Sequence, residues 1–596
     1  MITRKRAVGA ELTDAGVDFR VWAPDHHSVS VVIDGHDHLL DPEPDGHFHG
    51  MVPASAGTRY RFRLDDDEAT WPDPASRFQP DGPHGDSEVV DPRAYRWQDG
   101  AWHFEPRGLV IYEMHIGTFT REGTWRAAIG QLGALRDTGI TLLEVMPIHE
   151  FPGRFGWGYD GVDLWAPMHV YGAPDDFRAF VDAAHAHGLG VILDVVYNHL
   201  GPDGCYLGKF ASTYFTKRYE TDWGEAINFD GDGSEGVREF FAENAAYWID
   251  EFHLDGLRLD ATQSINDASE EHILALIARR AREAAKGRPI FIVGENEPQD
   301  VKLIDEYGLD ALWNDDWHHA ALVAATGRRE AYYTDYRGTP QEFVSMAQYG
   351  FLYQGQYYSW QKDRRGTPSL HLPPASLVCF IQNHDQLANS ARGERLQFLT
   401  APGRYRALTA LLLLGPNTPM LFQGQEFGSS APFLYFADHK PELAALVAKG
   451  RREFLEQFPS LKALDGQFAR PDAVDTFERC KLDHGERETH AAVVAMHRDL
   501  LRLRREMTGV VRGAVLGEEA LALRYDERLI IINLGAELRL DIFDEPLLAP
   551  PLDRRWELHW SSDSLDYGGP GITQIETKGT WIVPAQAAIV MRPLDY

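Results

Sequence analysis

Short hydrophobic runs alternate with amphipathic helical patterns through the middle of the chain. Eight such runs occur, at 109–116, 141–148, 190–199, 256–260, 290–297, 311–315, 376–385 and 418–424. Between them, apolar residues recur every three or four positions and a glycine often closes the pattern, as in "WRAAIGQLGALRDTG", which predicts helices. Eight strands alternating with helices predict an α/β fold, a (β/α)8 TIM barrel.

A doubly wound open sheet is the alternative arrangement of the same elements. Its commonest signature, a G-x-G-x-x-G turn after a strand, follows none of the eight runs. The pattern therefore favours the barrel.

Strand-like alternation of apolar and polar residues flanks this region on both sides. It appears in "VDFRVWAP" and "SVSVVIDG" near the start, and in "LALRYDERLIIINLGAEL" near the end. We therefore predict an N-terminal β-sandwich over 1–90, a catalytic barrel with linker and insertions over 91–507, and a C-terminal antiparallel β domain over 508–596.

Charge narrows the possible partners. Lys and Arg number 58 against 90 Asp and Glu, for a formal net charge of −32. Such a field repels phosphate backbones and anionic lipids, so nucleic acid and membrane partners are not expected, whereas neutral sugars fit. These numbers leave the oligomeric state open between monomer and dimer.

Cysteine usage and the first residues indicate a compartment. The three cysteines, Cys205, Cys379 and Cys480, are odd in number and far apart, which argues against a disulfide framework or a zinc site. No apolar run follows the basic start "MITRKRAVG", so no signal peptide is predicted. We expect a cytoplasmic protein.

Carboxylates stand at the ends of several predicted strands, where barrel enzymes gather their catalytic groups. The ends carry Asp194, Asp260, Glu295 and Asp385. Buried carboxylates are costly unless paired or used, so four of them at one rim point to chemistry.

The fourth run, "GLRLD", shows the pattern most clearly. Leu257 and Leu259 alternate with Arg258 and Asp260, so the two charged side chains share one strand face. A close cation keeps a carboxylate ionised, which suits a nucleophile. Glu295 follows the apolar "IFIVG", where burial favours the protonated form of a general acid. A nucleophile and an acid are the working pair of a glycosidase.

Four blocks resemble the motifs of α-amylase-type glycoside hydrolases: "DVVYNH", "GLRLDAT", "IVGENE" and "FIQNHD". The resemblance implies that Asp260 is the nucleophile, Glu295 the acid/base and Asp385 the third carboxylate, which stabilises the transition state. It implies sugar contacts for Tyr159, His199 and His384, and a positioning role for Arg258. Asp194 is more simply read as structural, holding Arg258.

Further blocks resemble one family within this group, the maltooligosyltrehalose trehalohydrolases. They include "YEMHIGTFTREGTW", "FGWGYDGVDLWAP", "WGEAINFD", "WNDDWHHA" and "YFADHKPEL". The resemblance implies hydrolysis of the α-1,4 bond next to the terminal trehalose of maltooligosyltrehalose, with release of trehalose. It implies further substrate contacts by Asp160, Trp223, Trp313, Asn314, Asp315, His318, His319, Asn383, Gln386, Asp438 and His439.

The purely structural interpretation is that the aromatic residues among these belong to the packed core and that the histidines are ordinary hydrogen-bonded groups. The asparagine that Asn198 matches helps to bind calcium in some amylases. The sequence shows no other cluster of calcium ligands, so we expect no metal and no organic cofactor. The rival functions are a branching or debranching enzyme on the same scaffold and, from another class, a non-catalytic carbohydrate-binding protein.

Overall fold

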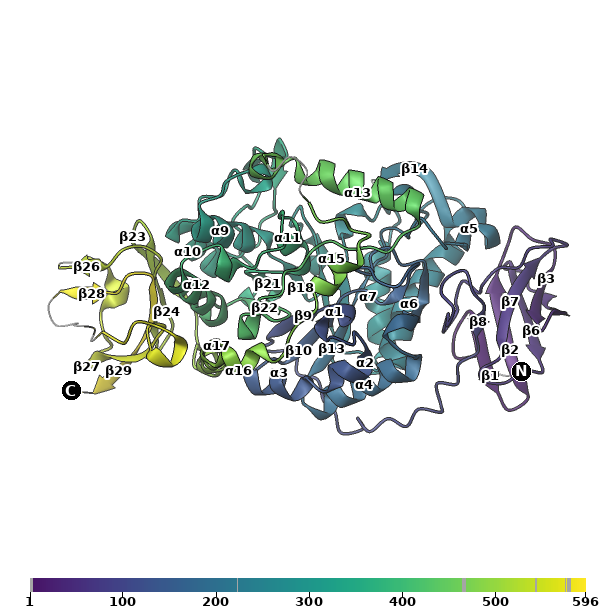
Figure 1. The fold of residues 1–596 in the computed structure, drawn as a ribbon, viewed down its shortest axis with the longest axis horizontal. Helices are drawn as coiled ribbons and strands as arrows, with labels where there is room; N and C mark the ends of the chain where they lie inside the picture. Colours follow the sequence, from purple (N-terminus) through teal and green to yellow (C-terminus); the bar gives the residue numbers. More distant parts are fainter. Residues whose placement is uncertain are drawn as a thin grey trace.

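The structure is a computed structural model that describes residues 4–221, 223–463, 468–541, 544–573, 575 and 580–595. Figure 1 shows three bodies in a row. The N-terminal sheets (purple) stand at one end, the barrel lies in the middle, and the C-terminal sheets (yellow) stand at the other end.

The centre is a closed barrel of eight parallel strands. Each of the eight predicted runs contains one of them, so the predicted barrel is confirmed and the open sheet is wrong. In barrel order the strands are β9 (Ile111–Met114), β10 (Leu142–Val145), β13 (Gly190–Val195), β16 (Gly256–Leu259), β17 (Phe291–Gly294), β18 (Ala311–Trp313), β21 (Leu377–Phe380) and β22 (Thr418–Phe422).

Alternation along the strands separates the barrel interior from the layer under the helices. Leu257 and Leu259 of β16 join the large core cluster shared with the helices. Ile192 of β13 and Val293 of β17 join the smaller cluster inside the barrel. Arg258, between the two leucines, therefore faces the interior.

Helices follow the strands and cover the barrel. The longer ones are α4 (Pro174–Ala186), α6 (Ser234–Glu251), α7 (Ile273–Ala284), α9 (Asp315–Thr326), α10 (Pro340–Tyr349), α12 (Pro402–Leu414), α13 (Pro441–Leu455) and α17 (Ala491–Arg504). Helix α3 (Leu132–Thr138) ends at Gly139 with φ of 113°, a left-handed C-cap that glycine adopts readily. No helix in the described part of the chain is long and apolar enough to span a bilayer.

The N-terminal domain is a pair of four-stranded sheets, as predicted. One has the order β1 (Gly9–Thr13), β2 (Gly16–Trp22), β6 (His47–Val52), β5 (Asp41–Pro42), and the other β4 (His36–Leu39), β3 (Val29–Ile33), β7 (Arg59–Leu64), β8 (Ser87–Glu88). Phe19, Val31 and Phe62 meet between them, and Phe210 from the barrel part joins this core. The irregular segment 89–110 then leads to the barrel (Figure 1).

The C-terminal domain is a five-stranded antiparallel sheet with an added pair, also as predicted. The sheet has the order β23 (Arg512–Gly517), β24 (Ala520–Arg524), β25 (Leu529–Asn533), β29 (Ala587–Asp595), β27 (Arg554–Ser561). The added pair is β26 (Leu538–Leu540) with β28 (Trp581–Val583). The sheet packs on α10 and α12 of the barrel.

Candidate active site

A single buried guanidinium organises the carboxyl ends of the strands. Arg258 of β16 is 1% exposed. Its Nη1 donates to Asp194 Oδ2 and to Asp260 Oδ1, both at 2.8 Å, and its Nη2 donates to Glu295 Oε2 at 2.7 Å. Three carboxylates predicted from separate strand ends thus share one cation.

The surroundings of Asp260 hold its carboxylate from two sides. Asn198 Nδ2 donates to Asp260 Oδ2 at 2.7 Å and to its backbone oxygen at 2.9 Å. The next residue, Ala261, has φ of 39°, a left-handed conformation that non-glycine residues adopt at a cost. Such strain is typical of functional turns, and this turn directs the Ala261 amide back toward Glu295.

Glu295 follows β17, the neighbour of β16 in the barrel. Its Oε2 accepts from the Ala261 amide at 3.1 Å, and its backbone oxygen accepts from Thr262 Oγ1 at 2.6 Å. Burial raises the pKa of Glu295 to about 8; Arg258 opposes the rise, and the charge of Asp260 adds to it. Glu295 is therefore a proton donor at neutral pH.

Tyr159 and His384 form the wall beside these acids. The Tyr159 hydroxyl donates to Asp194 Oδ2 at 2.6 Å, and its ring stacks on His384 with centroids 5.2 Å apart. Asn383 caps the short helix α11 (His384–Ala388), accepting from the Gln386 amide at 2.8 Å. Asp385 is half-buried, and its Oδ2 accepts from Asn389 at 3.1 Å.

Glu113 of β9 is a site residue that the sequence reasoning missed. It is 1% exposed, and its two oxygens contact His384 Nδ1 at 2.5 Å and the His384 amide at 2.9 Å. Burial alone lowers the pKa of His384, but the Glu113 carboxylate outweighs it and the net pKa is raised. The only signal in the sequence was an acid inside the apolar run "LVIYEMHI".

We expect Glu113→Gln to lower kcat/KM about 10- to 100-fold, because the imidazole loses both its charge partner and its fixed orientation. The measurement is kcat/KM against pH, since a change confined to stability leaves the shape of the profile unaltered. Glu235→Gln, an exposed glutamate at the start of α6, is the control. An unchanged profile in Glu113→Gln contradicts the positioning role.

A second acid, Glu144 of β10, lies inside the barrel below the site. It is 1% exposed, stands in register with Glu113, and its Oε2 has no hydrogen-bond partner among the described residues. Burial raises the pKa of Glu144 well above its usual value, and the negative Glu113 adds to this. Glu144 is thus held as a neutral acid.

His199 and Trp223 form an open aromatic edge of the site. Trp223 lies on the hairpin of β14 (Phe215–Thr221) and β15 (Gly224–Ile227), is 48% exposed, and stacks on His199 with centroids 4.6 Å apart. His199 Nε2 donates to the Tyr159 backbone oxygen at 3.0 Å. A partly free indole face at the mouth is available for a sugar ring.

The predicted residues after β18 divide into two groups. Trp313 is buried with its ring 4.3 Å from the Arg258 guanidinium, and Asn314 caps α9. His318 and His319 are also buried, with their Nδ1 atoms 3.2 Å apart. Asp315 is half-exposed; burial raises its pKa to about 7, and its charge in turn raises the pKa of Glu295.

The remaining predicted residues come from two segments: Asp160 precedes β12 (Asp163–Pro167), whereas Asp438 and His439 follow β22. His439 Nε2 lies 3.3 Å from Asp160 Oδ2, so the two segments meet there. Asp438 Oδ2 accepts from Arg154 Nε at 3.0 Å, so its carboxylate is already engaged within the protein.

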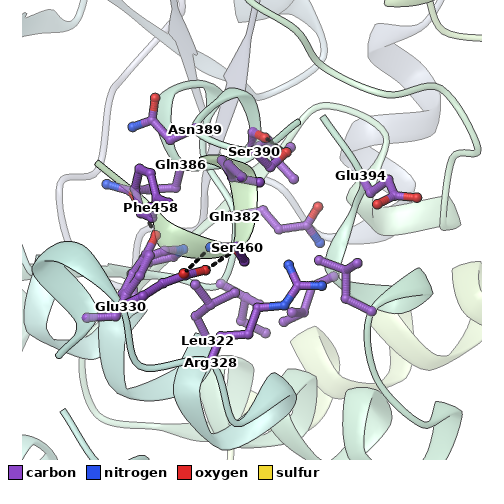
Figure 2. A pocket seen from close by; sticks show the side chains of 17 residues that line it. Leu322, Arg328, Glu330, Gln382, Gln386, Asn389, Ser390, Glu394, Phe458 and Ser460 are labelled. Carbon is purple, nitrogen blue, oxygen red and sulfur yellow. Dashed lines mark hydrogen bonds between the residues drawn. The ribbon is translucent and has the colours of Figure 1, made fainter. Parts of the chain in front are cut away.

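A separate cavity of about 60 Å³ is lined by residues of α9, of α11 and of the segment that follows α11 (Figure 2). Gln386 and His318 line it, and Glu330 bridges to Ser460 at one wall. Gln386 Oε1 accepts from the Tyr332 and Tyr333 hydroxyls at 3.0 and 2.8 Å. Asp260, Glu295 and Asp385 do not line this cavity. Its volume suits a few water molecules, at about 10–15 Å³ each.

Comparison with known proteins adds an independent line. Residues 76–226 match the α-amylase catalytic-domain family. The chain is similar to a malto-oligosyltrehalose trehalohydrolase of Deinococcus radiodurans, with 42% identity over 543 residues and 88% of each chain covered. It is also similar to one of Saccharolobus solfataricus, with 39% identity, 84% of this chain and 87% of the relative.

A solved structure agrees over almost the whole length. It is a crystal structure of a putative α-amylase from Salmonella typhimurium, with a TM-score of 0.87 and 38% identity. The match covers 98% of this chain and 100% of that chain, so both flanking sheet domains fall within it.

Proposed function

The chain belongs to the malto-oligosyltrehalose trehalohydrolase family, and we propose that it hydrolyses the α-1,4-glucosidic bond next to the terminal trehalose of maltooligosyltrehalose, releasing trehalose. The observation that carries the chemistry is the Arg258 guanidinium, which bonds to both Asp260 and Glu295. One guanidinium keeps the two carboxyl groups close, which favours a retaining mechanism, where they stand about 5–5.5 Å apart.

The first step uses both acids at once. The Asp260 carboxylate attacks the anomeric carbon while the Glu295 proton passes to the glycosidic oxygen. The glycosidic bond breaks, trehalose leaves with that proton, and the maltooligosyl chain stays as an ester of Asp260.

The second step returns the enzyme to its starting state. The Glu295 carboxylate takes a proton from a water molecule, whose oxygen attacks the same carbon and displaces Asp260. Two displacements restore the α configuration, and both carboxyl groups recover their initial protonation. The Asp385 carboxylate stabilises the ring as it develops positive oxocarbenium character, and His384, whose pKa the Glu113 carboxylate raises, acts as a hydrogen-bond donor to sugar hydroxyls.

The trehalose side is proposed to lie toward Asp315. Among the described residues its half-exposed carboxylate has no hydrogen-bond partner, so sugar hydroxyls are suited to it. Asn314, His318 and His319, which are buried, support this side from the same segment, and Asp438 with the neighbouring pair Asp160 and His439 is proposed as a further substrate contact. Trp223 covers the mouth.

Setting and assembly remain proposals. The three cysteines Cys205, Cys379 and Cys480 are unpaired, which agrees with a reducing cytoplasm. A monomer or a dimer both suit the geometry, because each barrel carries its own complete set of carboxylates.

Product analysis tests the proposed reaction. We expect purified protein to release trehalose and α-maltotriose from maltotriosyltrehalose, and to leave maltopentaose and amylopectin nearly untouched. Chromatography identifies the sugars, and NMR of the fresh product identifies the anomer. Formation or cleavage of α-1,6 links would assign a branching or debranching activity instead, and binding without any turnover would assign a carbohydrate-binding protein.

A further inference from the structure

A second cavity, of about 450 Å³, lies where the N-terminal sheets meet the barrel. Four parts of the chain line it: the segment around β1, Arg77 between β7 and β8, the 89–110 segment, and the end of α6 with the loop after it. That loop enters the amino end of β16, whereas Asp260 follows its carboxyl end. The cavity is therefore separate from the site of hydrolysis, and it falls within the roughly 300–1,000 Å³ typical of small-molecule sites.

The side chains that line this cavity are held in place by ring stacking and hydrogen bonds. Trp97 stacks on His253 with ring centroids 3.8 Å apart and an interplanar angle of 15°. His253 has φ of 54°, a left-handed conformation, and its Nδ1 lies 2.8 Å from Asp99. Tyr95 packs edge-on against Trp97 and its hydroxyl donates to Asp182 at 3.0 Å. Two aromatic rings are thus held in fixed positions along the cavity.

The polar groups supply both donors and acceptors. The cationic lining residues are Lys5, Arg6, Arg77, Arg93 and Arg96, and the acidic ones are Glu11, Asp250 and Glu251. Asp250 is already paired with Arg6 at 2.6 Å and with Lys5 at 2.9 Å, and Glu251 with Arg178 at 3.0 Å. Cationic residues therefore outnumber acidic ones by five to three in the lining, and Asp250 and Glu251 already have cationic partners.

Arg77 is the most unusual member of the lining. It is 4% exposed, lies 4.5 Å from both the Trp165 and Tyr247 rings, and donates to the Val8 backbone oxygen at 3.1 Å. Among the described residues no carboxylate forms an ion pair with it, and its Nη1 has no partner. A buried donor without an acceptor is energetically costly, so an acceptor supplied by a ligand is favoured.

We propose that this cavity is a second carbohydrate-binding site, which takes a segment of a neutral α-glucan. Fixed aromatic walls suit the apolar faces of sugar rings, and mixed arginine and carboxylate groups suit their hydroxyls. A phosphorylated ligand is the competing occupant, because the lining carries five cationic residues against three acidic ones, whereas the net charge of −32 opposes the approach of an anion. The proposal takes its ligand from the proposed function, but binding here does not require hydrolysis at Asp260.

Titration of maltoheptaose into the full-length Asp260→Asn protein, followed by calorimetry, tests the site without turnover. We expect two binding events. Trp97→Ala and, separately, Arg96→Ala should weaken one of them at least 10-fold and leave the other unchanged. Arg107→Ala, an exposed arginine of the same segment outside the cavity, is the matched control.

The outcomes separate this proposal from the reaction. Melting temperatures of the variants check that they fold. If Trp97→Ala does not fold, Arg96→Ala alone tests the site, because Arg96 is exposed and its removal leaves the packing intact. A single binding event that neither variant alters overturns the second site, whatever the product analysis gives. Inorganic phosphate is the second probe: phosphate that binds at the cavity where maltoheptaose does not overturns the choice of a neutral glucan.

Discussion

Asp260→Ala is expected to lower kcat/KM on maltotriosyltrehalose by about 10⁴-fold or more, equivalent to about 5.5 kcal/mol of transition-state stabilisation. The reason is that no other carboxylate can take the place of Asp260. Asp194 shares Arg258 Nη1 with Asp260, but it is also bonded to the Tyr159 hydroxyl. Released trehalose, measured by chromatography, gives the rate.

Azide distinguishes the loss of a nucleophile from a general loss of structure. In Asp260→Ala a small anion can enter the vacated space and attack the anomeric carbon directly, giving the β-glycosyl azide through a single displacement. A variant that is inactive and also forms no azide product, yet folds normally, contradicts the assignment of Asp260.

Glu295→Gln is expected to lower kcat by about 10²- to 10⁴-fold, the usual contribution of a positioned acid/base. In the wild type the pKa of Glu295 is raised to about 8, so the side chain is protonated below that pH. Activity therefore falls as the pH rises past 8 and the proton donor is lost. The variant should lose this alkaline limb, which the pH profile of kcat/KM measures.

Glu297→Gln is the matched control for Glu295→Gln. Glu297 lies two residues further on, and its Oε1 accepts from Arg365 Nη1 at 2.6 Å instead of from Arg258. It should keep the alkaline limb and most of the activity. Loss of the limb in Glu297→Gln, with its survival in Glu295→Gln, would exchange the two roles.

Stability should change in the opposite direction to activity in Glu295→Gln. The folded pKa of Glu295 lies above the unfolded value near 4.5, so folding is penalised as the pH rises between the two values and unpenalised below 4.5. The amide removes this penalty. At pH 7.5 denaturant unfolding should show a gain of up to about 4 kcal/mol, vanishing near pH 4.

The barrel was predictable because its strands are buried on both faces. Parallel strands of this kind read as nearly continuous apolar runs, and each of the eight runs contains a strand. The positions of Arg258 and Asp260 were predictable for the same reason, because a charged side chain within such an apolar run must face the barrel interior or its rim.

The rest of the site depends on contacts between distant parts of the chain. Glu113 holds His384 across 271 residues, and no local pattern relates the two. His318 and His319 lie on a helix whose buried face was not evident from its composition, and the structure packs both against aromatic rings. Their contact with substrate stays a prediction.

The charge of Asp260 has a consequence for the order of events. It is one of the groups that keep the proton on Glu295 in the resting enzyme. In the proposed mechanism, forming the glycosyl ester neutralises Asp260, so its contribution to the pKa of Glu295 disappears and Arg258 is left to favour ionised Glu295. The covalent intermediate thereby converts Glu295 from the acid of the first half-reaction into the base of the second. The attachment of the substrate to Asp260 is what triggers this change of role.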